Sequence, residues 1–387
     1  MKKILLLLII PFLSFGQGWE QIFGATKSGS GYYGTSAKQV QDGGYIVCGG
    51  THFTQSVLFG MTPSDICIFK TDTNGEEEWS KTFGNEYWDF GKSIQQTTDG
   101  GYVIAGYING FGMGGGNAYL LKVDDNGEEQ WSQIFDFGIA ESVQQTTDGG
   151  YIITGYDSSD IYLLKTNENG EQQWSQTFGE SFNDRAMFVQ QTTDGGYVIT
   201  GCTSVINSLG NAATDVYLTK MNANGEQQWS QTFGGPGNDK AHCVQQTTDG
   251  GYIITGDDEE NIYDPGNDFW VANSDVFLIK TNELGQEEWV QSFGGAGNDS
   301  GKSVQQTNDG GYIIAAHTST INNISNGVYL IKTDAQGNTP STNITELPTI
   351  NKSLITTVDI LGRKTTNKGF QLQIYDDGSV EKKYLIK

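Results

Sequence analysis

The tetrapeptide Asp-Gly-Gly-Tyr recurs six times and divides most of this chain into similar units of 46 to 60 residues. Self-similarity at such a period is typical of repeat architectures, in which each unit buries its apolar face against its neighbours. Two other anchors recur with it, a tryptophan and a lysine that ends an apolar run. The tyrosines are Tyr45, Tyr102, Tyr151, Tyr197, Tyr252 and Tyr312; the tryptophans are Trp19, Trp79, Trp131, Trp174, Trp229 and Trp289; the lysines are Lys70, Lys122, Lys165, Lys220, Lys280 and Lys332.

Each unit contains four short runs with β-strand character. They are exemplified by residues 303–307 (strand A), 252–256 (strand B), 276–280 (strand C) and 229–234 (strand D). An Asp-Gly-Gly turn joins strands A and B, and in most units an Asn-Gly turn joins strands C and D. Both turn types predict antiparallel hairpins, because their residues tolerate positive φ. Four antiparallel strands per unit indicate a propeller blade.

The two ends of the repeat region complement each other. The chain supplies a lone D-type strand at residues 19–24, whereas the last unit, residues 302–333, lacks a D strand. We therefore expect an all-β protein, a six-bladed β-propeller closed by its N-terminal strand and followed by a small C-terminal β domain. An open solenoid is the alternative, but it would need capping units rather than complementary halves.

The first 16 residues have the pattern of a secretory signal peptide. Lys2 and Lys3 precede an apolar run over residues 4–13, and Ser14 and Gly16 are small residues before the expected cleavage site. A membrane anchor is the alternative, but the run is shorter than the ~20 residues needed to span a bilayer. We expect residues 17–338 to form the propeller of an extracellular protein, either secreted or held at the outer cell surface, with no membrane-spanning segment after cleavage.

A polar, proline-containing linker at residues 339–350 precedes a different C-terminal segment, residues 351–387. There, Asp-Ile-Leu-Gly-Arg (359–363) and Tyr-Asp-Asp-Gly-Ser-Val-Glu-Lys-Lys (375–383) alternate strand and turn residues. This segment resembles the type A C-terminal sorting domain of the Bacteroidota type IX secretion system. The resemblance implies export by that machinery as a partner, through a signal comprising Gly362, Arg363, Tyr375, Asp376, Asp377, Gly378, Lys382 and Lys383.

The repeat itself resembles the β-propeller repeats of secreted Bacteroidota proteins and, more loosely, kelch and quinoprotein blades. The Gly-x-x-x-Trp of residues 75–79 is similar to the quinoprotein blade motif. Because those repeats are structural, the resemblance implies the fold and no activity.

Loop lengths distinguish the two faces of the predicted propeller. The A–B and C–D turns are short and nearly invariant, whereas the B–C loops and the D–A connections vary. Binding residues occur disproportionately in such variable loops. We therefore expect contact with a glycan, a protein or a cation on the B–C and D–A face. The candidate ligand-binding residues are Trp88, Asp89, Asp184, Arg185, Asp239 and Asp299 from the D–A connections, and Asp257, Asp258, Tyr263 and Trp270 from the longest B–C insert.

Each group of candidates has a structural alternative. Carboxylates with carbonyl oxygens are the ligands that Ca²⁺ prefers, which makes the insert at residues 257–270 a candidate cation site. The alternative for the insert is a solvated acidic loop, and the alternative for the Asn-Asp pairs is turn chemistry. No other cofactor is evident.

No catalytic motif is visible in the sequence. The three histidines, His52, His242 and His317, form no zinc-binding pair, and the four cysteines follow no metal-ligand spacing. Cys48 and Cys67 are either neighbours able to form a disulfide or buried free thiols. A sialidase is excluded, since it needs an arginine triad and the propeller contains Arg185 alone.

Charge separates the two modules. The chain carries 46 acidic and 22 basic residues, which argues against nucleic-acid binding. Almost all of this acidity belongs to the propeller. We interpret the protein as an exported, non-enzymatic binding propeller; the alternative is a polysaccharide-active hydrolase that uses paired carboxylates on the same face.

Overall fold

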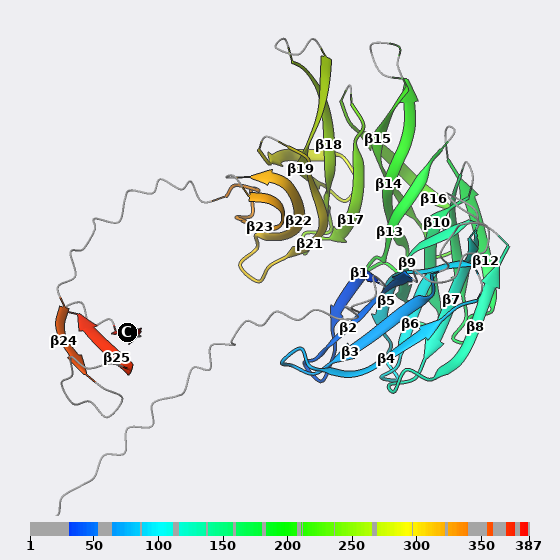
Figure 1. Cartoon of the computed structure of the whole chain (residues 1–387). Coiled ribbons are helices and arrows are strands. Elements are labelled where there is room, and N and C mark those ends of the chain that lie inside the picture. Colours follow the sequence, from blue (N-terminus) through cyan, green and yellow to red (C-terminus); the bar gives the residue numbers. More distant parts are fainter. Residues whose placement is uncertain are drawn as a thin grey trace, which may run out of the picture. The chain divides into compact units, whose positions relative to one another are not determined.

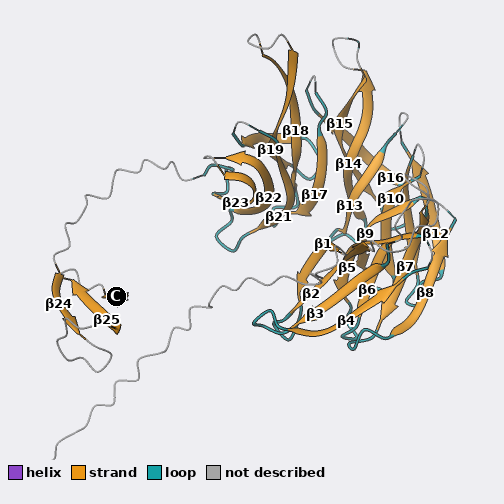
Figure 2. Cartoon of the chain, in the orientation of Figure 1, coloured by secondary structure: helices purple, strands orange, loops and turns teal. Residues whose placement is uncertain are grey.

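The computed structural model describes residues 31–52, 64–85, 87–110, 116–136, 138–157, 160–179, 183–206, 210, 212–235, 237–264, 269–295, 297–321, 324–339, 354–358, 369–375 and 380–385. These residues divide into two compact units, one ending at Asn338 and the other beginning at Thr339. All described regular elements are β-strands (Figure 2), and no described helix is long and apolar enough to cross a membrane.

Six antiparallel sheets form the first unit, and five of them have four strands (Figure 1). The first two sheets contain β1 (Gly31–Gln39), β2 (Tyr45–His52), β3 (Ile66–Thr71), β4 (Glu77–Phe83), β5 (Trp88–Gln96), β6 (Tyr102–Gly110), β7 (Asn117–Val123) and β8 (Glu129–Phe135). The third and fourth contain β9 (Ile139–Gln145), β10 (Tyr151–Tyr156), β11 (Ile161–Thr166), β12 (Gln172–Phe178), β13 (Arg185–Gln191), β14 (Tyr197–Ile206), β15 (Ala212–Met221) and β16 (Gln227–Phe233).

The fifth sheet contains β17 (Lys240–Gln246), β18 (Tyr252–Asp264), β19 (Phe269–Thr281) and β20 (Glu287–Phe293). The sixth has the three strands β21 (Asp299–Gln306), β22 (Tyr312–Ile321) and β23 (Ile324–Thr333). The first five sheets follow the predicted order A-B-C-D, and the sixth has strands A, B and C among the described residues. The A strands β1, β5, β9, β13, β17 and β21 line one central cavity. The predicted six-bladed propeller is therefore confirmed.

Consecutive blades pack through their apolar faces. Strand B of each blade lies against strand A of the next, as β6 does against β9 and β14 against β17. Trp174 of one blade meets the fully buried Tyr197 of the next, with ring centroids 6.0 Å apart. The same Trp–Tyr contact joins the other consecutive blades. The predicted packing between blades is confirmed for the five described tryptophans, and Trp19 lies outside the described residues.

A glutamine ladder adds polar contacts between blades. The side chain of Gln144 accepts a hydrogen bond from the backbone N–H of Gln191 in the next blade, at 2.6 Å. The Gln191 side chain in turn accepts from the backbone N–H of Thr147, at 2.9 Å. This reciprocal pattern explains the repeated Gln-Gln at the end of strand A. In the first blade Lys38 replaces the first glutamine, so the ladder lacks that acceptor there.

The sixth blade has an uncovered outer strand among the described residues. Val328 and Leu330 on β23 are 90% and 65% exposed, whereas Val276 and Leu278 at the same positions of the fifth blade are fully buried. This apolar surface needs a further strand and a neighbouring blade to bury it. The predicted closing strand, residues 19–24, lies outside the described residues, so closure of the ring stays a prediction.

The second unit contains a three-stranded antiparallel sheet of β24 (Leu354–Val358), β25 (Gly369–Tyr375) and β26 (Val380–Leu385). The predicted small β domain is present. The segments 359–363 and 376–379 of the predicted sorting signal lie outside the described residues.

A lysine at the end of each strand C stabilises the Asp-Gly-Gly turn. Lys165 Nζ lies 2.9 Å from Asp148 Oδ2 and also donates to the Thr166 carbonyl and the Gln173 side chain. A Cβ on Gly150 would clash with the Thr166 backbone carbonyl and would lie 2.6 Å from this ammonium, which explains the glycine at that position. Although burial opposes it, bonds from Thr146, Lys165 and Gly150 lower the pKa of Asp148 to about 2.

We predict that Asp148→Asn destabilises the protein at pH 7 and not at pH 2. Because the pKa is lowered on folding, the stabilisation is complete above the unfolded pKa near 3.8 and is lost as the pH falls towards 2. The Asp148 side chain is 57% exposed, so solvent screening reduces the expected loss to about 1 kcal/mol. Urea unfolding at both pH values measures it. The exposed Asp125→Asn variant is the control, and an equal loss at pH 2 would contradict the prediction.

Candidate functional site

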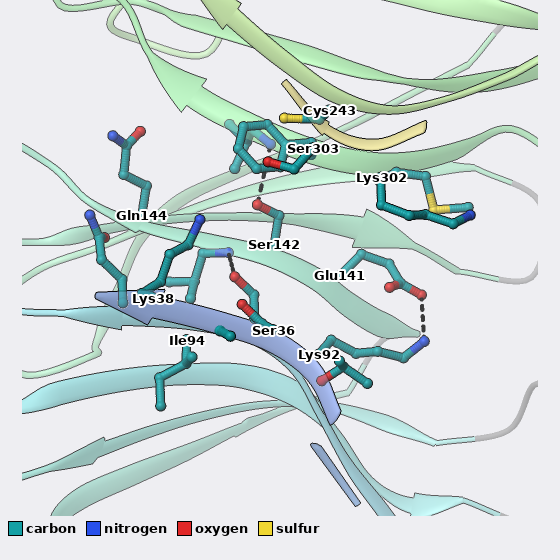
Figure 3. Close-up of a pocket in the computed structure, with 18 of the residues that line it drawn as sticks. Ser36, Lys38, Lys92, Ile94, Glu141, Ser142, Gln144, Cys243, Lys302 and Ser303 are labelled. Atoms are coloured by element: carbon teal, nitrogen blue, oxygen red, sulfur yellow. Dashed lines mark hydrogen bonds and ion pairs between the residues drawn. The ribbon is translucent and has the colours of Figure 1, made fainter. Parts of the chain in front are cut away.

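The central cavity of the described propeller has a volume of about 880 Å³. Its wall consists of the six A strands, each contributing residues at equivalent positions (Figure 3). In each A strand, the residue four positions before the second glutamine of the ladder lines the cavity. Together these residues form one ring around the cavity: Thr35, Lys92, Glu141, Met187, His242 and Lys302. The next ring is smaller and mostly hydroxylic: Ser36, Ser93, Ser142, Phe188, Cys243 and Ser303.

Two ionic clusters lie in the first ring. Lys92 Nζ pairs with Glu141 Oε1 of the next blade at 3.2 Å. On the other side, His242 Nε2 lies 2.6 Å from Asp257 Oδ1 and 3.1 Å from Lys302 Nζ. Asp257 also accepts a bond from the Ser300 hydroxyl at 2.6 Å. Although burial opposes it, the His242 and Ser300 contacts lower the pKa of Asp257 and keep it ionised.

The histidine cluster has groups suited to proton transfer and to anion binding. Desolvation by the channel wall, with the nearby Lys240, lowers the pKa of Lys302 from its usual 10.5. The contact between His242 Nε2 and Asp257 Oδ1 orients the imidazole. Sequence reasoning treated His242 as an isolated residue and did not select Lys92, Glu141 or Lys302. Aligning the six units on the Gln-Gln pair would have placed all four in one column.

The aspartates of the D–A connections lie inside blade junctions. Asp89, Asp184, Asp239 and Asp299 are at most 5% exposed. Asp89 accepts bonds from the backbone N–H groups of Asn85 and Asn109, and Asp184 accepts one from Thr203 Oγ1 at 2.6 Å. Their carboxylates thus hold the connection against strand B of the same blade, which is the turn role that the sequence left open.

A second aspartate accompanies each of these four. Asp215 Oδ1 and Asp239 Oδ2 lie 2.3 and 2.6 Å from the point where a Cβ on Gly234 would sit. The pairs Asp65–Asp89 and Asp275–Asp299 flank Gly84 and Gly294 in the same way, and Asp160–Asp184 flanks Gly179 more loosely. Burial raises the pKa of Asp215, and burial together with the negative charges of Asp215 and Asp257 raises the pKa of Asp239. Asp215 Oδ1 is buried and accepts no hydrogen bond from the described residues.

The remaining predicted residues lie at the B–C face. Arg185 is exposed and stacks over the Tyr156 ring, 4.8 Å from its centroid. Trp88 is half-buried and forms a parallel bridge with Ser64. The insert expected as a loop is instead the end of a long hairpin, because β18 and β19 continue to Asp264 and from Phe269. In it Tyr263 pairs directly with Trp270, and Asp258 accepts from the Asp275 N–H at 3.2 Å.

Metal and disulfide expectations have different outcomes. The described residues contain no group of three or more histidine, cysteine or carboxylate side chains placed to hold a metal ion, so Ca²⁺ binding stays a prediction. All four cysteines are buried free thiols, and burial raises the pKa of Cys48 and Cys67 to about 12. Of the two alternatives for this pair, the free thiols are confirmed.

The chain matches no family model and no curated protein. Several solved propeller structures are similar to it in fold. They include the Pan2 WD40 domain of Neurospora crassa (12% identity, TM-score 0.44, covering 73% of this chain and 85% of that one) and the Dos1 propeller (12%, 0.43, 76% and 69%). A PL25 polysaccharide lyase described as an ulvan lyase has 9% identity and a TM-score of 0.45, covering 78% of each chain.

We predict opposite effects for the two members of one aspartate pair. Asp215→Asn raises the melting temperature by a few degrees at pH 7, because it removes a charge whose folded pKa is raised and lets an amide donate to Asp239. Asp239→Asn lowers it, because the Gly235 N–H loses its carboxylate acceptor at 2.6 Å, at a cost of about 1–3 kcal/mol.

Thermal unfolding in EDTA measures both variants. The gain from Asp215→Asn shrinks as the pH falls below the raised pKa, since the wild-type carboxyl is then neutral as well. A loss of stability in both variants would show that the pair is not repulsive.

Proposed function

We propose that the protein is an exported binding propeller that contacts a glycan, protein or cation through its B–C and D–A face. The observation that carries this proposal is the contrast between the two faces. On the A–B and C–D face, the same turn hydrogen bonds recur in every blade, as Gly149 N–H to Thr146 and Gly195 N–H to Thr192. Because these turns are alike in all six blades, this face has no feature that distinguishes one blade from another.

The opposite face differs from blade to blade. The third blade closes its B–C connection with a tight turn, in which Asp157 and Asp160 exchange backbone hydrogen bonds. In the fifth blade the same connection extends into strands of 13 residues, which project from the sheet in Figure 1. The D–A connections border these hairpins, since Asn238 Nδ2 contacts Glu259 Oε1 at 3.2 Å. Variable hairpins beside the channel entrance favour recognition on this side.

A hydrolase with paired carboxylates is the second candidate. Glu141 and Asp257 are the carboxylates of the two ionic clusters described at the channel wall. Two-carboxylate glycosidases need one protonated carboxylic acid near neutral pH. The lowered pKa of Asp257 suits a nucleophile or base and not that acid, so Glu141 would have to donate the proton. We favour the binding function because the hydrolase requires this further assignment.

Export through a type IX secretion system is part of the proposal. What supports it is the resemblance of the C-terminal motifs together with the separate unit that contains β24–β26. A detachable signal should fold apart from its cargo, as a unit of about 40 residues beyond a linker would. We infer an extracellular location, either in the medium or at the cell surface.

We predict that shortening the fifth-blade hairpin abolishes ligand binding. Replacing residues 259–274 with Asn-Gly keeps strands B and C paired through Asp258 and Asp275 and removes the projecting surface. The purified full chain is screened on a glycan array and with a panel of polysaccharides for hydrolysis. Thr248→Ala on the opposite face is the control. Binding that survives the shortening would contradict the assignment to the hairpin, and turnover that Glu141→Gln abolishes would contradict the binding proposal.

We predict that deleting residues 351–387 retains the protein inside the producing cell. The variant keeps the whole propeller unit, so its melting curve should match that of the full chain. The measurement is immunodetection in medium, surface and periplasmic fractions of a host with a type IX system. Undiminished appearance of the truncated chain outside the cell would refute the sorting role.

A further inference from the structure

The cations of the propeller fall into two groups. Its 13 lysines and arginines face 41 carboxylates within residues 17–340. Six lysines hold the Asp-Gly-Gly turns, and Lys81 pairs with Glu128 at 2.6 Å. Lys27 lies outside the described residues. All the others belong to channel-lining strands: Lys38 on β1, Lys92 on β5, Arg185 on β13, Lys240 on β17 and Lys302 on β21.

Channel cations lack the carboxylate partners that the other lysines have. Lys38, Lys92 and Lys302 line the cavity, whereas Arg185 stacks on Tyr156 at the B–C face. Of these three lining lysines, only Lys92 forms an ion pair within the described residues, with Glu141. Lys302 contacts the imidazole of His242 instead, and the nearest carboxylate, Asp257, is already bonded to His242 and Ser300. The propeller has about three carboxylates for each cation, so a randomly placed cation would usually have a carboxylate nearby. Cations without a carboxylate partner at one cavity therefore depart from that expectation.

This arrangement is unfavourable in the absence of an anion. Lys240 and desolvation both lower the pKa of Lys302, which shows that its positive charge is opposed at that position. Lys38 and Lys302 come from the first and last blades, and Figure 3 shows both at the same cavity as Lys92. An anion entering the channel would relieve the repulsion and form charge-assisted hydrogen bonds.

The rest of the wall defines the chemistry of the ligand. Four serines from four blades, Ser36, Ser93, Ser142 and Ser303, line the cavity together with the ladder glutamines. The Ser93 and Ser142 hydroxyls also accept backbone N–H bonds from the next blade. Phe188 adds one aromatic face. Hydroxyls, amides and an aromatic ring bind sugars, and about 880 Å³ is within the range of sites that enclose small ligands.

We propose that the central channel binds an acidic oligosaccharide, with Lys302 and Lys38 contacting its carboxylate or sulfate groups and the serine ring contacting its hydroxyls. The inference rests on the proposed binding function and specifies its ligand class. It places recognition in the channel, between the cations of different blades, in addition to the hairpin surface.

Isothermal titration calorimetry on the full chain tests the proposal with three probes. Trigalacturonate carries carboxylates, a carrageenan disaccharide carries sulfate, and maltotriose is neutral. We expect at least one acidic probe to bind more tightly than maltotriose, and to weaken as salt rises from 50 to 500 mM. The probe that binds identifies the anionic group.

Matched variants locate the site. Loss of one charge-assisted bond predicts an increase of about tenfold in Kd for Lys302→Gln and for Lys38→Gln. Lys302→Arg retains binding, and Lys81→Gln, which removes a lysine outside the channel, leaves it unchanged. Circular dichroism and the melting temperature confirm folding of each variant.

Several outcomes would overturn the proposal. The first is that maltotriose binds as tightly as the acidic probes, and the second is that neither acidic probe binds. The third is that Lys302→Gln and Lys38→Gln leave the Kd unchanged. The fourth is that hexaglutamate binds equally tightly, which would assign an acidic peptide as the ligand instead. If array ligands are still lost on shortening the hairpin, the binding function stands and only the channel assignment fails. If the array shows no ligand either, the binding function itself fails.

Discussion

One lysine ammonium group in each blade, buried in the first five blades, holds the fold together. The lysine that ends strand C bonds to the aspartate of the A–B turn and to the following backbone carbonyl, and in the first five blades to a side chain of strand D. Its side chain is at most 5% exposed in those blades. Leaving such a charge without a partner would be costly, so the turn, strand C and strand D must be positioned together. The lysine, its aspartate partner and the turn glycines recur in every blade because each blade must satisfy this ammonium group.

Contacts between blades depend on the geometry that this lysine sets. The tyrosine after the turn is fully buried and receives the tryptophan of the preceding blade. That tryptophan also approaches the C–D turn glycine of the next blade, where a Cβ on Gly170 would lie 2.4 Å from Trp131. With the A–B and C–D face committed to these contacts, variation is confined to the opposite hairpins and to the side chains of the inner strands.

The sequence supported the blade count, strand order and turn chemistry because these follow from local spacing. Asp-Gly-Gly and Asn-Gly turns are short-range signals of hairpins, and they recur in all or most of the six units. The candidate site was less accessible. Asp89 and Asp239 looked like exposed loop residues, yet backbone N–H groups from the same blade bury and bind them. The bond from Asn109 to Asp89 joins residues 20 positions apart, and the sequence of one unit does not reveal it.

What the sequence determined by itself was the repeat: four antiparallel strands per unit and the residues that close each turn, because hairpins form between neighbours in the chain. What only the tertiary structure decided was which side chains of different units meet. Lys92 reaches Glu141 and His242 reaches Lys302 only because their strands stand side by side around one axis. The two residues of each contact are about 50 and 60 positions apart in the sequence, and the circular arrangement of the blades brings them together. The same arrangement places several lysines at one cavity inside an acidic protein.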